Sequence, residues 1–240
     1  MTVTKYQDKD IRWKWLKEKG YNVLSDKHQY AYMQSLFADV DVVQSVFVDA
    51  PAGTGKTSLA VSAGVYEVER GTYDKIIYIR NAVAVRDQGF LPGSLEEKEY
   101  PFYAPLFDAL GTLDCDGYRN WYDIDSEYKK IEMKSTSYLR GVNFKNAFVI
   151  IDEAQSMDLV ELQTVLTRIH DSCKVVLIGS TLQVDGKLKL IGGITPFEVY
   201  MKHFEGHLSV RHKLETNYRG AFSLHADKVL ETVNKLESEK

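Results

Sequence analysis

Long apolar segments are absent from this sequence, and cysteine is scarce. No hydrophobic run approaches the roughly 20 residues needed to span a bilayer. The polar stretch from Met1 to Asp10 lacks the apolar core of a signal peptide. The two cysteines, Cys115 and Cys173, provide neither a disulfide framework nor a metal-ligand cluster. Together these absences favour a cytoplasmic protein without a membrane partner.

An excess of positive charge is also missing. The 240 residues carry a formal net charge of -4, whereas proteins that coat nucleic acid indiscriminately are usually basic. Contact with nucleic acid would therefore need a local patch. The sequence has no internal repeat and no low-complexity linker. Its 44% hydrophobic and 27% charged residues are typical of a globular chain that can bury a substantial core.

Segments with strand and helix patterns alternate along the chain. Strands are predicted at 42–48, 75–79, 147–151 and 174–178. Helices are predicted at 9–19, from a cap at Ser25 to 37, at 58–69, after a capping box of Ser94 and Glu97, at 157–169 and at 221–236. This alternation predicts an α/β fold with a mostly parallel, doubly wound sheet and helices on both faces. We expect residues 1–24 to form an N-terminal helical extension and 25–240 a single domain.

A glycine-rich loop follows the first predicted strand. Residues 50–57, Ala-Pro-Ala-Gly-Thr-Gly-Lys-Thr, match the Walker A pattern G-x-x-x-x-G-K-[ST] except that Ala50 replaces the first glycine. Glycines let backbone N–H groups approach phosphate oxygens, the lysine reaches the β- and γ-phosphates, and the threonine offers a hydroxyl to Mg²⁺. An ordinary glycine-rich turn would not require that lysine and threonine. We expect the ATP phosphates to be bound by Pro51, Ala52, Gly53, Thr54, Gly55, Lys56, Thr57 and Ser58.

A carboxylate pair follows another apolar strand. Asp152 and Glu153 come directly after the run that ends at Ile151, as in a Walker B motif. Such an aspartate can hold Mg²⁺ through its water shell, and the glutamate can accept a proton from an attacking water. Two solvated acids that open a loop are the alternative. Because parallel sheets bind ligands at the carboxyl ends of their strands, we expect this pair to meet the glycine-rich loop.

Four segments together resemble the PhoH-like ATPases, the phosphate-starvation-inducible family of bacteria and phages. These segments are 51–57, 89–98 (Gly-Phe-Leu-Pro-Gly-Ser-Leu-Glu-Glu-Lys), 138–141 (Tyr-Leu-Arg-Gly) and 152–155 (Asp-Glu-Ala-Gln). The last is also similar to motif II of superfamily 1 helicases. The resemblance implies a RecA-like P-loop core that hydrolyses ATP with Mg²⁺ and forms a homo-oligomer, for which a hexameric ring is one arrangement. It also implies a helicase-like role on single-stranded RNA or DNA.

The helicase resemblance assigns roles to further residues. Gln183 would sense the γ-phosphate, although Ser180 stands where motif III has aspartate. In a segment similar to motif IV, Tyr218 would stack on adenine and Arg219 would contact the γ-phosphate; a surface tyrosine and arginine at a helix start are the alternative.

Two more residues match family positions. Gln29 would read the adenine edge, since a side-chain amide both donates and accepts; a solvated helix glutamine is the alternative. Arg211 matches a PhoH-like position and would act as an arginine finger from a neighbouring subunit, unless it is a charge on a surface strand.

Candidate nucleic-acid contacts are weaker. Arg80 and Asn81 follow the second strand, where relatives meet nucleic acid or phosphate. Basic residues lie close in sequence to aromatic ones, which suits single-strand stacking. They are Lys129, Lys130, Lys134 and Arg140, with Tyr118, Trp121, Tyr122 and Tyr128. Five acids in the same stretch favour instead a solvated excursion or a protein-binding surface. Lys187 and Lys189 are a second candidate contact.

The sequence shows one motor core and no second RecA-like domain, so two-domain stepping along a strand is not expected. The alternative function is a nucleotide-gated protein-interaction switch with slow ATP hydrolysis and no nucleic-acid substrate. A third interpretation is a phosphotransferase such as a kinase. Glu153 argues against it, because this residue suggests a water nucleophile.

Overall fold

A parallel sheet forms the centre of the computed structural model, which describes residues 11, 13–81, 100–114, 117–123, 126–136, 139, 141–183 and 188–238. The described strands are β1 (Ser45–Asp49), β2 (Lys75–Arg80), β3 (Ile131–Ser135), β4 (Ala147–Asp152), β5 (Lys174–Gly179) and β6 (Ser209–Lys213). They form a six-stranded sheet in the order β3-β2-β4-β5-β1-β6, and every pairing in it is parallel. The predicted α/β fold with a parallel, doubly wound sheet is confirmed.

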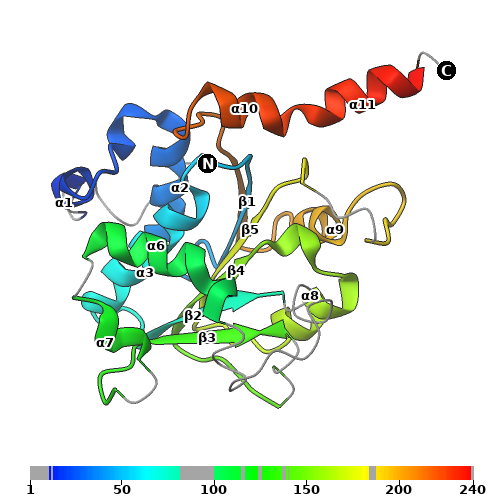
Figure 1. Ribbon diagram of the computed structural model, residues 1–240. Helices are drawn as coiled ribbons and strands as arrows, with labels where there is room; N and C mark the ends of the chain where they lie inside the picture. The colour runs from blue at the N-terminus through cyan, green and yellow to red at the C-terminus, as the bar shows by residue number, and fades with distance from the viewer. Residues whose placement is uncertain are drawn as a thin grey trace, which may run out of the picture.

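Helices cover both faces of this sheet (Figure 1). One face carries α2 (Lys27–Phe37), α3 (Lys56–Glu69) and α6 (Ala104–Leu113); the other carries α8 (Leu159–Leu166) and α9 (Pro196–His203). The short helices are α1 (Trp13–Glu18) and α7 (Arg119–Tyr122), with 3₁₀ turns η2 (Val23–Ser25), η3 (Tyr100–Tyr103) and η5 (Ala154–Ser156). The chain then continues into α10 (Ala221–Asp227) and α11 (Val229–Ser238), which project from the body.

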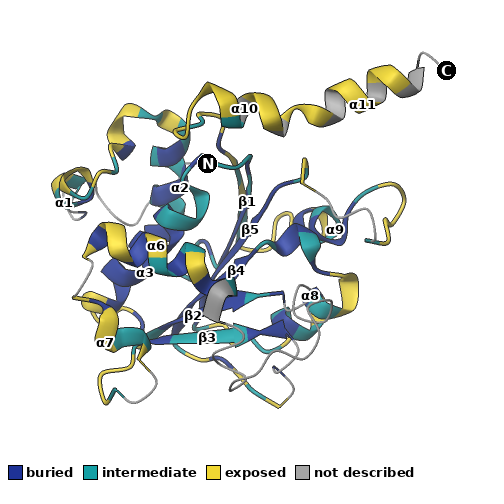
Figure 2. Ribbon diagram, in the orientation of Figure 1, coloured by how far each residue is buried: buried dark blue, intermediate teal, exposed yellow. Residues whose placement is uncertain are grey.

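The central strands are buried on both faces (Figure 2). All six residues of β4 and of β5 are buried. On β4, Phe148 and Ile150 pack on the α3 side, whereas Val149 and Ile151 pack on the α8 side. Successive side chains of a strand point to opposite faces, so a strand between two helical layers needs a continuous apolar run. That requirement explains why the apolar runs of the sequence predicted these strands correctly.

Several element boundaries differ from the predicted ones. Asp26, not Ser25, caps α2, because its carboxylate accepts hydrogen bonds from the backbone N–H groups of His28 and Gln29. Helix α3 begins at Lys56 instead of residue 58. Strand β1 begins at Ser45 rather than 42, since residues 39–43 form a hydrogen-bonded turn. The predicted C-terminal helix is divided into α10 and α11.

The segment before α2 packs on the same core. Leu16 of α1 and Val23 of η2 are buried in the apolar cluster that contains α2 and α3. The division at residue 24 stays a prediction. None of the helices in the described ranges has both the length and the apolarity to cross a bilayer. Segment 89–98, its capping box, Tyr138, Arg140 and Lys187 lie outside the described residues.

Candidate nucleotide-binding site

The glycine-rich loop joins β1 to α3 and uses backbone angles that favour glycine. Gly53 and Gly55 have φ values of 78° and 82°, in the left-handed region. A Cβ atom on Gly53 would lie 2.8 Å from Oδ1 of Asn217, so that position has no room for a side chain. The Lys56 ammonium donates to the carbonyl of Pro51 at 3.2 Å. The lysine thus folds back over a loop whose N–H groups precede a helix N-terminus, the arrangement that binds phosphate.

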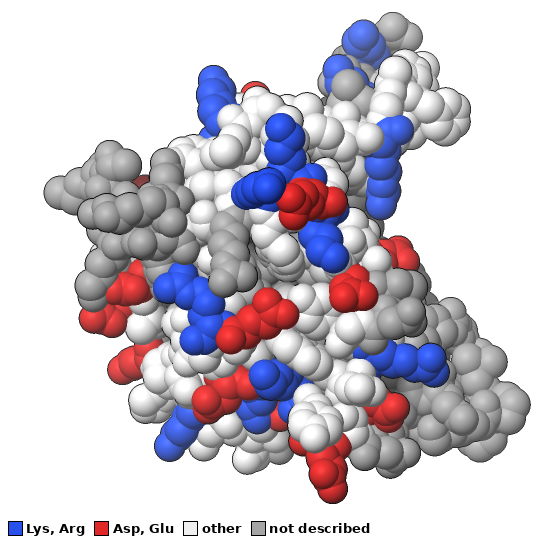
Figure 3. Space-filling view, turned by 90° about the vertical axis from the view of Figure 1, so that its left-hand side faces the viewer, with Lys and Arg blue, Asp and Glu red and all other residues white. Residues whose placement is uncertain are grey.

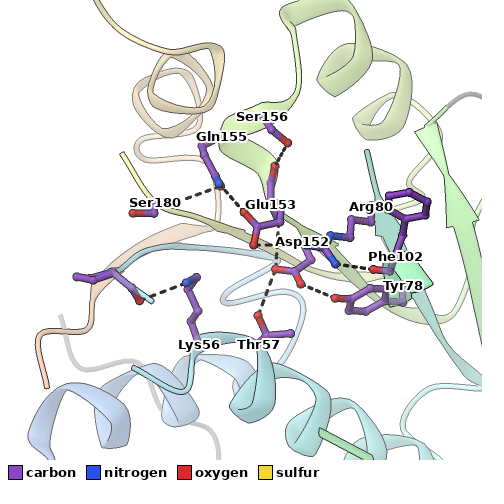
Figure 4. A network of polar contacts seen from close by, with 11 residues as sticks. Lys56, Thr57, Tyr78, Arg80, Phe102, Asp152, Glu153, Gln155, Ser156 and Ser180 are labelled. Atoms are coloured by element: carbon purple, nitrogen blue, oxygen red, sulfur yellow. Dashed lines mark hydrogen bonds and ion pairs between the residues drawn. The ribbon is translucent and has the colours of Figure 1, made fainter. Parts of the chain in front are cut away.

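Asp152 lies next to this loop at the end of β4 (Figure 4). Its carboxylate accepts hydrogen bonds from Thr57 Oγ1, at 3.2 Å to Oδ1, and from the Tyr78 hydroxyl at Oδ2. Burial raises the pKa of Asp152, and the charge of Glu153 raises it further, while Tyr78, Arg80 and Lys56 lower it. A carboxylate beside a hydroxyl supplies the hard oxygen ligands that Mg²⁺ prefers. The described residues therefore fit the predicted metal site of Thr57 and Asp152.

Glu153 begins the turn after β4 with a left-handed backbone, φ 55°. Its Oε2 accepts from Gln155 Nε2 at 2.5 Å, and its Oε1 lies 3.8 Å from Nη2 of Arg80. Gln155 Oε1 in turn accepts from the backbone N–H of Ser180 at 3.1 Å. The loop after β5 is therefore connected to Glu153 through Gln155, although Ser180 replaces the motif III aspartate.

The segment after β6 crosses the glycine-rich loop. Asn217 Nδ2 donates to the carbonyl of Ala52 at 3.0 Å, and the Tyr218 backbone N–H donates to that of Gly53 at 2.8 Å. The Tyr218 hydroxyl reaches Oδ2 of Asp26, the cap of α2, at 2.9 Å. Asn217 and Asp26 were not predicted as site residues.

Gln29 also belongs to the loop environment. Its Nε2 donates to the carbonyl of Thr54 at 3.0 Å, and the residue is buried. The Thr54 hydroxyl donates to the carbonyl of Pro51 at 3.1 Å, so Thr54 supports the loop from inside. The alternative of a solvated helix glutamine does not hold for Gln29.

One cavity of about 910 Å³ gathers most of the predicted site residues. It is lined by Gln29, Ala52, Gly53, Gly55, Lys56, Thr57, Ser58, Asp152, Glu153, Gln183, Tyr218 and Arg219. Pro105 and Asp108 of α6, which the sequence did not indicate, also line it. The volume is within the range of small-molecule sites. The residues predicted to bind phosphate, metal and adenine thus come from distant parts of the chain and line one cavity.

A family model described as PhoH-like protein matches residues 24–225. The chain belongs to the PhoH-like protein family. This family has a P-loop ATPase core, so the resemblance found in the sequence is confirmed.

Individual relatives support this membership. Protein PhoH2 of Bacillus subtilis (strain 168) is 39% identical over 145 residues, which cover 56% of this chain and 31% of the relative. A PhoH-like protein of the same organism is 36% identical over 163 residues, which cover 67% of this chain and 50% of the relative. Protein PhoH of Escherichia coli (strain K12) is 32% identical over 147 residues, covering 61% and 41%. The chain therefore spans half or less of the length of these relatives.

Arg211 lies outside the cavity of this PhoH-like chain. It is on β6, at the end of the sheet order, and its Nη2 donates to Glu205 Oε2 at 3.2 Å and to the carbonyl of Met201. Among the described residues Arg211 does not line the cavity. Action across a subunit boundary stays a prediction for this arginine.

Most of the described residues that were predicted to contact nucleic acid contact other protein side chains in this PhoH-like chain. Tyr118 is buried and donates to Glu69 Oε1 at 2.8 Å. Lys134 pairs with Glu132 at 3.0 Å. Lys130 Nζ lies 4.9 Å from the centroid of the Trp121 ring, and Tyr122 packs against Phe107. Lys129, Tyr128 and Lys189 remain exposed.

The pair at the end of β2 also contacts protein groups. Asn81 is buried and donates to the carbonyl of Ser156 at 2.9 Å. Arg80 donates to the carbonyl of Phe102 and faces Glu153. These contacts connect Arg80 to the predicted general base.

Proposed function

We propose that this PhoH-like chain hydrolyses ATP in a Mg²⁺-dependent reaction. The observation that carries the proposal is the convergence of Lys56, Asp152 and Glu153 on one cavity. Lys56 begins α3, Asp152 ends β4 and Glu153 follows it, and Thr57 links the two elements through its 3.2 Å hydrogen bond to Asp152. A structural turn or a pair of solvated acids would not require this convergence.

Each side chain has a defined task in the proposed reaction. Lys56 and the loop N–H groups bind the phosphates, and Thr57 and Asp152 hold Mg²⁺, which neutralises charge on the phosphate oxygens when bound. Glu153 accepts the proton of the attacking water. Gln183 and Arg219 contact the γ-phosphate; Gln29 and Tyr218 bind adenine. Gln29 keeps its Oε1 and one N–H for the base while it holds the loop.

We further propose that the chain works as a homo-oligomer on single-stranded RNA or DNA. Family membership and the partly exposed Arg211 on edge strand β6 support it. On the face shown in Figure 3, basic and acidic side chains are interspersed. Binding to a strand would therefore depend on a local patch, and its affinity should fall steeply with added salt.

One observation favours the second candidate, a nucleotide-gated switch that binds a protein partner. Phe222 of α10 and Val229, Val233 and Leu236 of α11 are exposed, with Phe222 at 91%. These helices follow Arg219, which lines the cavity. Exposed apolar residues on a projecting helix are typical of a protein-binding surface.

The test is phosphate release measured with and without Mg²⁺, and with single-stranded RNA or DNA at low salt. Wild-type protein should release phosphate only when Mg²⁺ is present. Lys56→Ala should release no phosphate with or without Mg²⁺. Stimulation by a single strand supports the nucleic-acid role. Absence of stimulation, combined with an oligomer or partner complex that differs between ATP and ADP, supports the switch. A phosphorylated small molecule in place of free phosphate would contradict hydrolysis.

A further inference from the structure

Arg80 occupies the carboxyl end of β2, directly opposite Asp152 in the strand register. Its side chain is 23% exposed. Because Tyr78 precedes it by two residues, both side chains project to the face of the sheet that carries α3. Figure 4 shows the Arg80 guanidinium beside the two carboxylates of the site.

The guanidinium makes two different contacts with its two terminal nitrogen atoms. Nη1 donates to the carbonyl of Phe102, and Nη2 lies 3.8 Å from Oε1 of Glu153. Oε2 of Glu153 is already held by Gln155 at 2.5 Å. Both oxygens of the carboxylate therefore face a protein donor, which restricts the rotamers open to Glu153. A planar guanidinium presents two separate terminal nitrogen atoms in a fixed fork, whereas a lysine would have to make both contacts from a single nitrogen atom.

The carbonyl that anchors Arg80 belongs to the 3₁₀ turn that precedes one wall of the cavity. Phe102 lies in η3, and α6 begins two residues later. Pro105 and Asp108 of α6 line the same cavity as Glu153. One arginine side chain therefore connects the predicted base to the η3–α6 segment.

We propose that Arg80 is a positioning residue that holds the Glu153 carboxylate in place for proton transfer and fixes it relative to the η3–α6 segment. The proposal rests on the proposed function, because it requires Glu153 to act as the base. Arg80 does not line the cavity among the described residues, so it acts through Glu153 and not on the nucleotide. It should affect turnover and not ATP affinity.

The first experiment measures kcat and KM for ATP in Arg80→Gln. The expected loss in kcat is roughly 10- to 100-fold, the scale of a misplaced catalytic group, with KM within about twofold of wild type. Arg80→Lys keeps the charge and one contact, so it should recover part of the loss. It also replaces Arg80→Gln if thermal melting shows that the glutamine variant is unfolded.

The matched control is Lys75→Gln at the opposite end of β2. Lys75 also pairs with a glutamate, Glu132, at 2.6 Å, but away from the cavity. This variant should keep wild-type kcat. A loss equal to that of Arg80→Gln would show a general weakening of β2 and would overturn the positioning role.

A double mutant isolates the path through the base. Adding Arg80→Gln to Glu153→Gln should lower kcat no further, because a positioning residue has nothing left to position. A further tenfold loss in that background, an unchanged or increased kcat in Arg80→Gln alone, or a raised KM with normal kcat would each overturn the proposal. If wild-type protein hydrolysed no ATP, the proposed function itself would fail, and that result is separate from these outcomes.

Discussion

Two buried charged residues lie at opposite ends of neighbouring strands in the parallel sheet. Asp152 ends β4 at the carboxyl edge, and Lys174 begins β5 at the amino edge; their exposed fractions are 1% and 0%. The Lys174 ammonium donates to the carbonyls of Ser35 at 3.0 Å, Ala38 at 2.7 Å and Val43. Asp152 is held by hydroxyl groups and lines the cavity.

The difference separates a buried charge that protein groups surround from one that faces a cavity. An ammonium has three N–H donors, and all three of those on Lys174 meet backbone acceptors at the end of α2 and before β1. Burial nevertheless lowers the pKa of Lys174 to about 7. Asp152 instead faces a space that a cation can enter. At the amino ends of the strands the fold satisfies its buried charge internally, and at the carboxyl ends it presents one to the cavity, where parallel sheets usually bind ligands.

The largest expected effect tests the carboxyl edge. Glu153→Gln should lower kcat by about 10²–10⁴-fold, because an amide cannot accept the proton of water, and ATP should still bind. The measurement is single-turnover hydrolysis together with nucleotide affinity. Glu132→Gln is the matched control, because Glu132 is similarly exposed but pairs with Lys75 away from the cavity. Normal turnover by the Glu153→Gln variant would show that Glu153 is not the general base.

A comparable effect on stability is expected at the amino edge. Lys174→Met preserves most of the side-chain volume but leaves three backbone carbonyls, two of them in buried contacts, without this donor. We expect the free energy of unfolding in urea to fall by about 3 kcal/mol, with kcat per folded molecule unchanged. Asp152→Asn is the contrasting variant, which should abolish Mg²⁺-dependent hydrolysis with little loss of stability. If Lys174→Met reduced kcat at unchanged stability, the assignment of a stabilising role to Lys174 and a site role to Asp152 would be wrong.

The sequence indicated those cavity residues that lie in short motifs. The loop at 50–57 and the pair Asp152 and Glu153 are each contained within a few residues. Tyr78, Asn217 and Asp26 were missed because their partners are far away in sequence. The separations are 74 residues for Tyr78 to Asp152, 165 for Asn217 to Ala52 and 192 for Tyr218 to Asp26. In addition, a tyrosine within an apolar strand gives no local sign that its hydroxyl faces a carboxylate.

Strand prediction followed burial in the same way. β4 and β5 are buried at every position and read as apolar runs. β3 (Ile-Glu-Met-Lys-Ser) and β6 (Ser-Val-Arg-His-Lys) lie at the ends of the sheet order, are less buried, and mix charged with apolar residues. Their sequence pattern is therefore weak, and only tertiary pairing with β2 and β1 makes them strands.

A smaller effect concerns the hydroxyl that holds Asp152. Tyr78→Phe removes the hydrogen bond to Oδ2 while the ring stays in the core. We expect the Mg²⁺ concentration for half-maximal activity to rise by about tenfold, the usual scale for a lost ligand-orienting contact. Tyr118→Phe is the control, since it also loses a bond to a carboxylate, that of Glu69, away from the cavity. An equal Mg²⁺ dependence in the two variants would remove the proposed role of Tyr78.

The smallest expected effect concerns His212, a partly buried titratable group that lies outside the cavity. His212 on β6 packs 5.7 Å from the Tyr32 ring centroid and contacts the Ser35 hydroxyl at 2.8 Å, but it does not line the cavity. Burial lowers the pKa of His212 to about 4 from the usual 6.5. Between these values the unfolded chain binds a proton that the folded chain does not, so stability falls as pH drops from 6.5 toward 4.

His212→Gln should remove this contribution to the pH dependence. The difference in free energy of unfolding, wild type minus variant, should decrease by about 1–2 kcal/mol when the pH is lowered from 7.5 to 4.5. This value is smaller than the full pKa shift implies, because His212 is partly exposed. Urea denaturation of both proteins at the two pH values measures it, and the carboxylates that titrate in both proteins cancel in the difference. Because His212 does not reach the cavity, kcat at pH 7.5 should be unchanged. A lower kcat in His212→Gln would extend the functional region from the cavity to the edge strand β6.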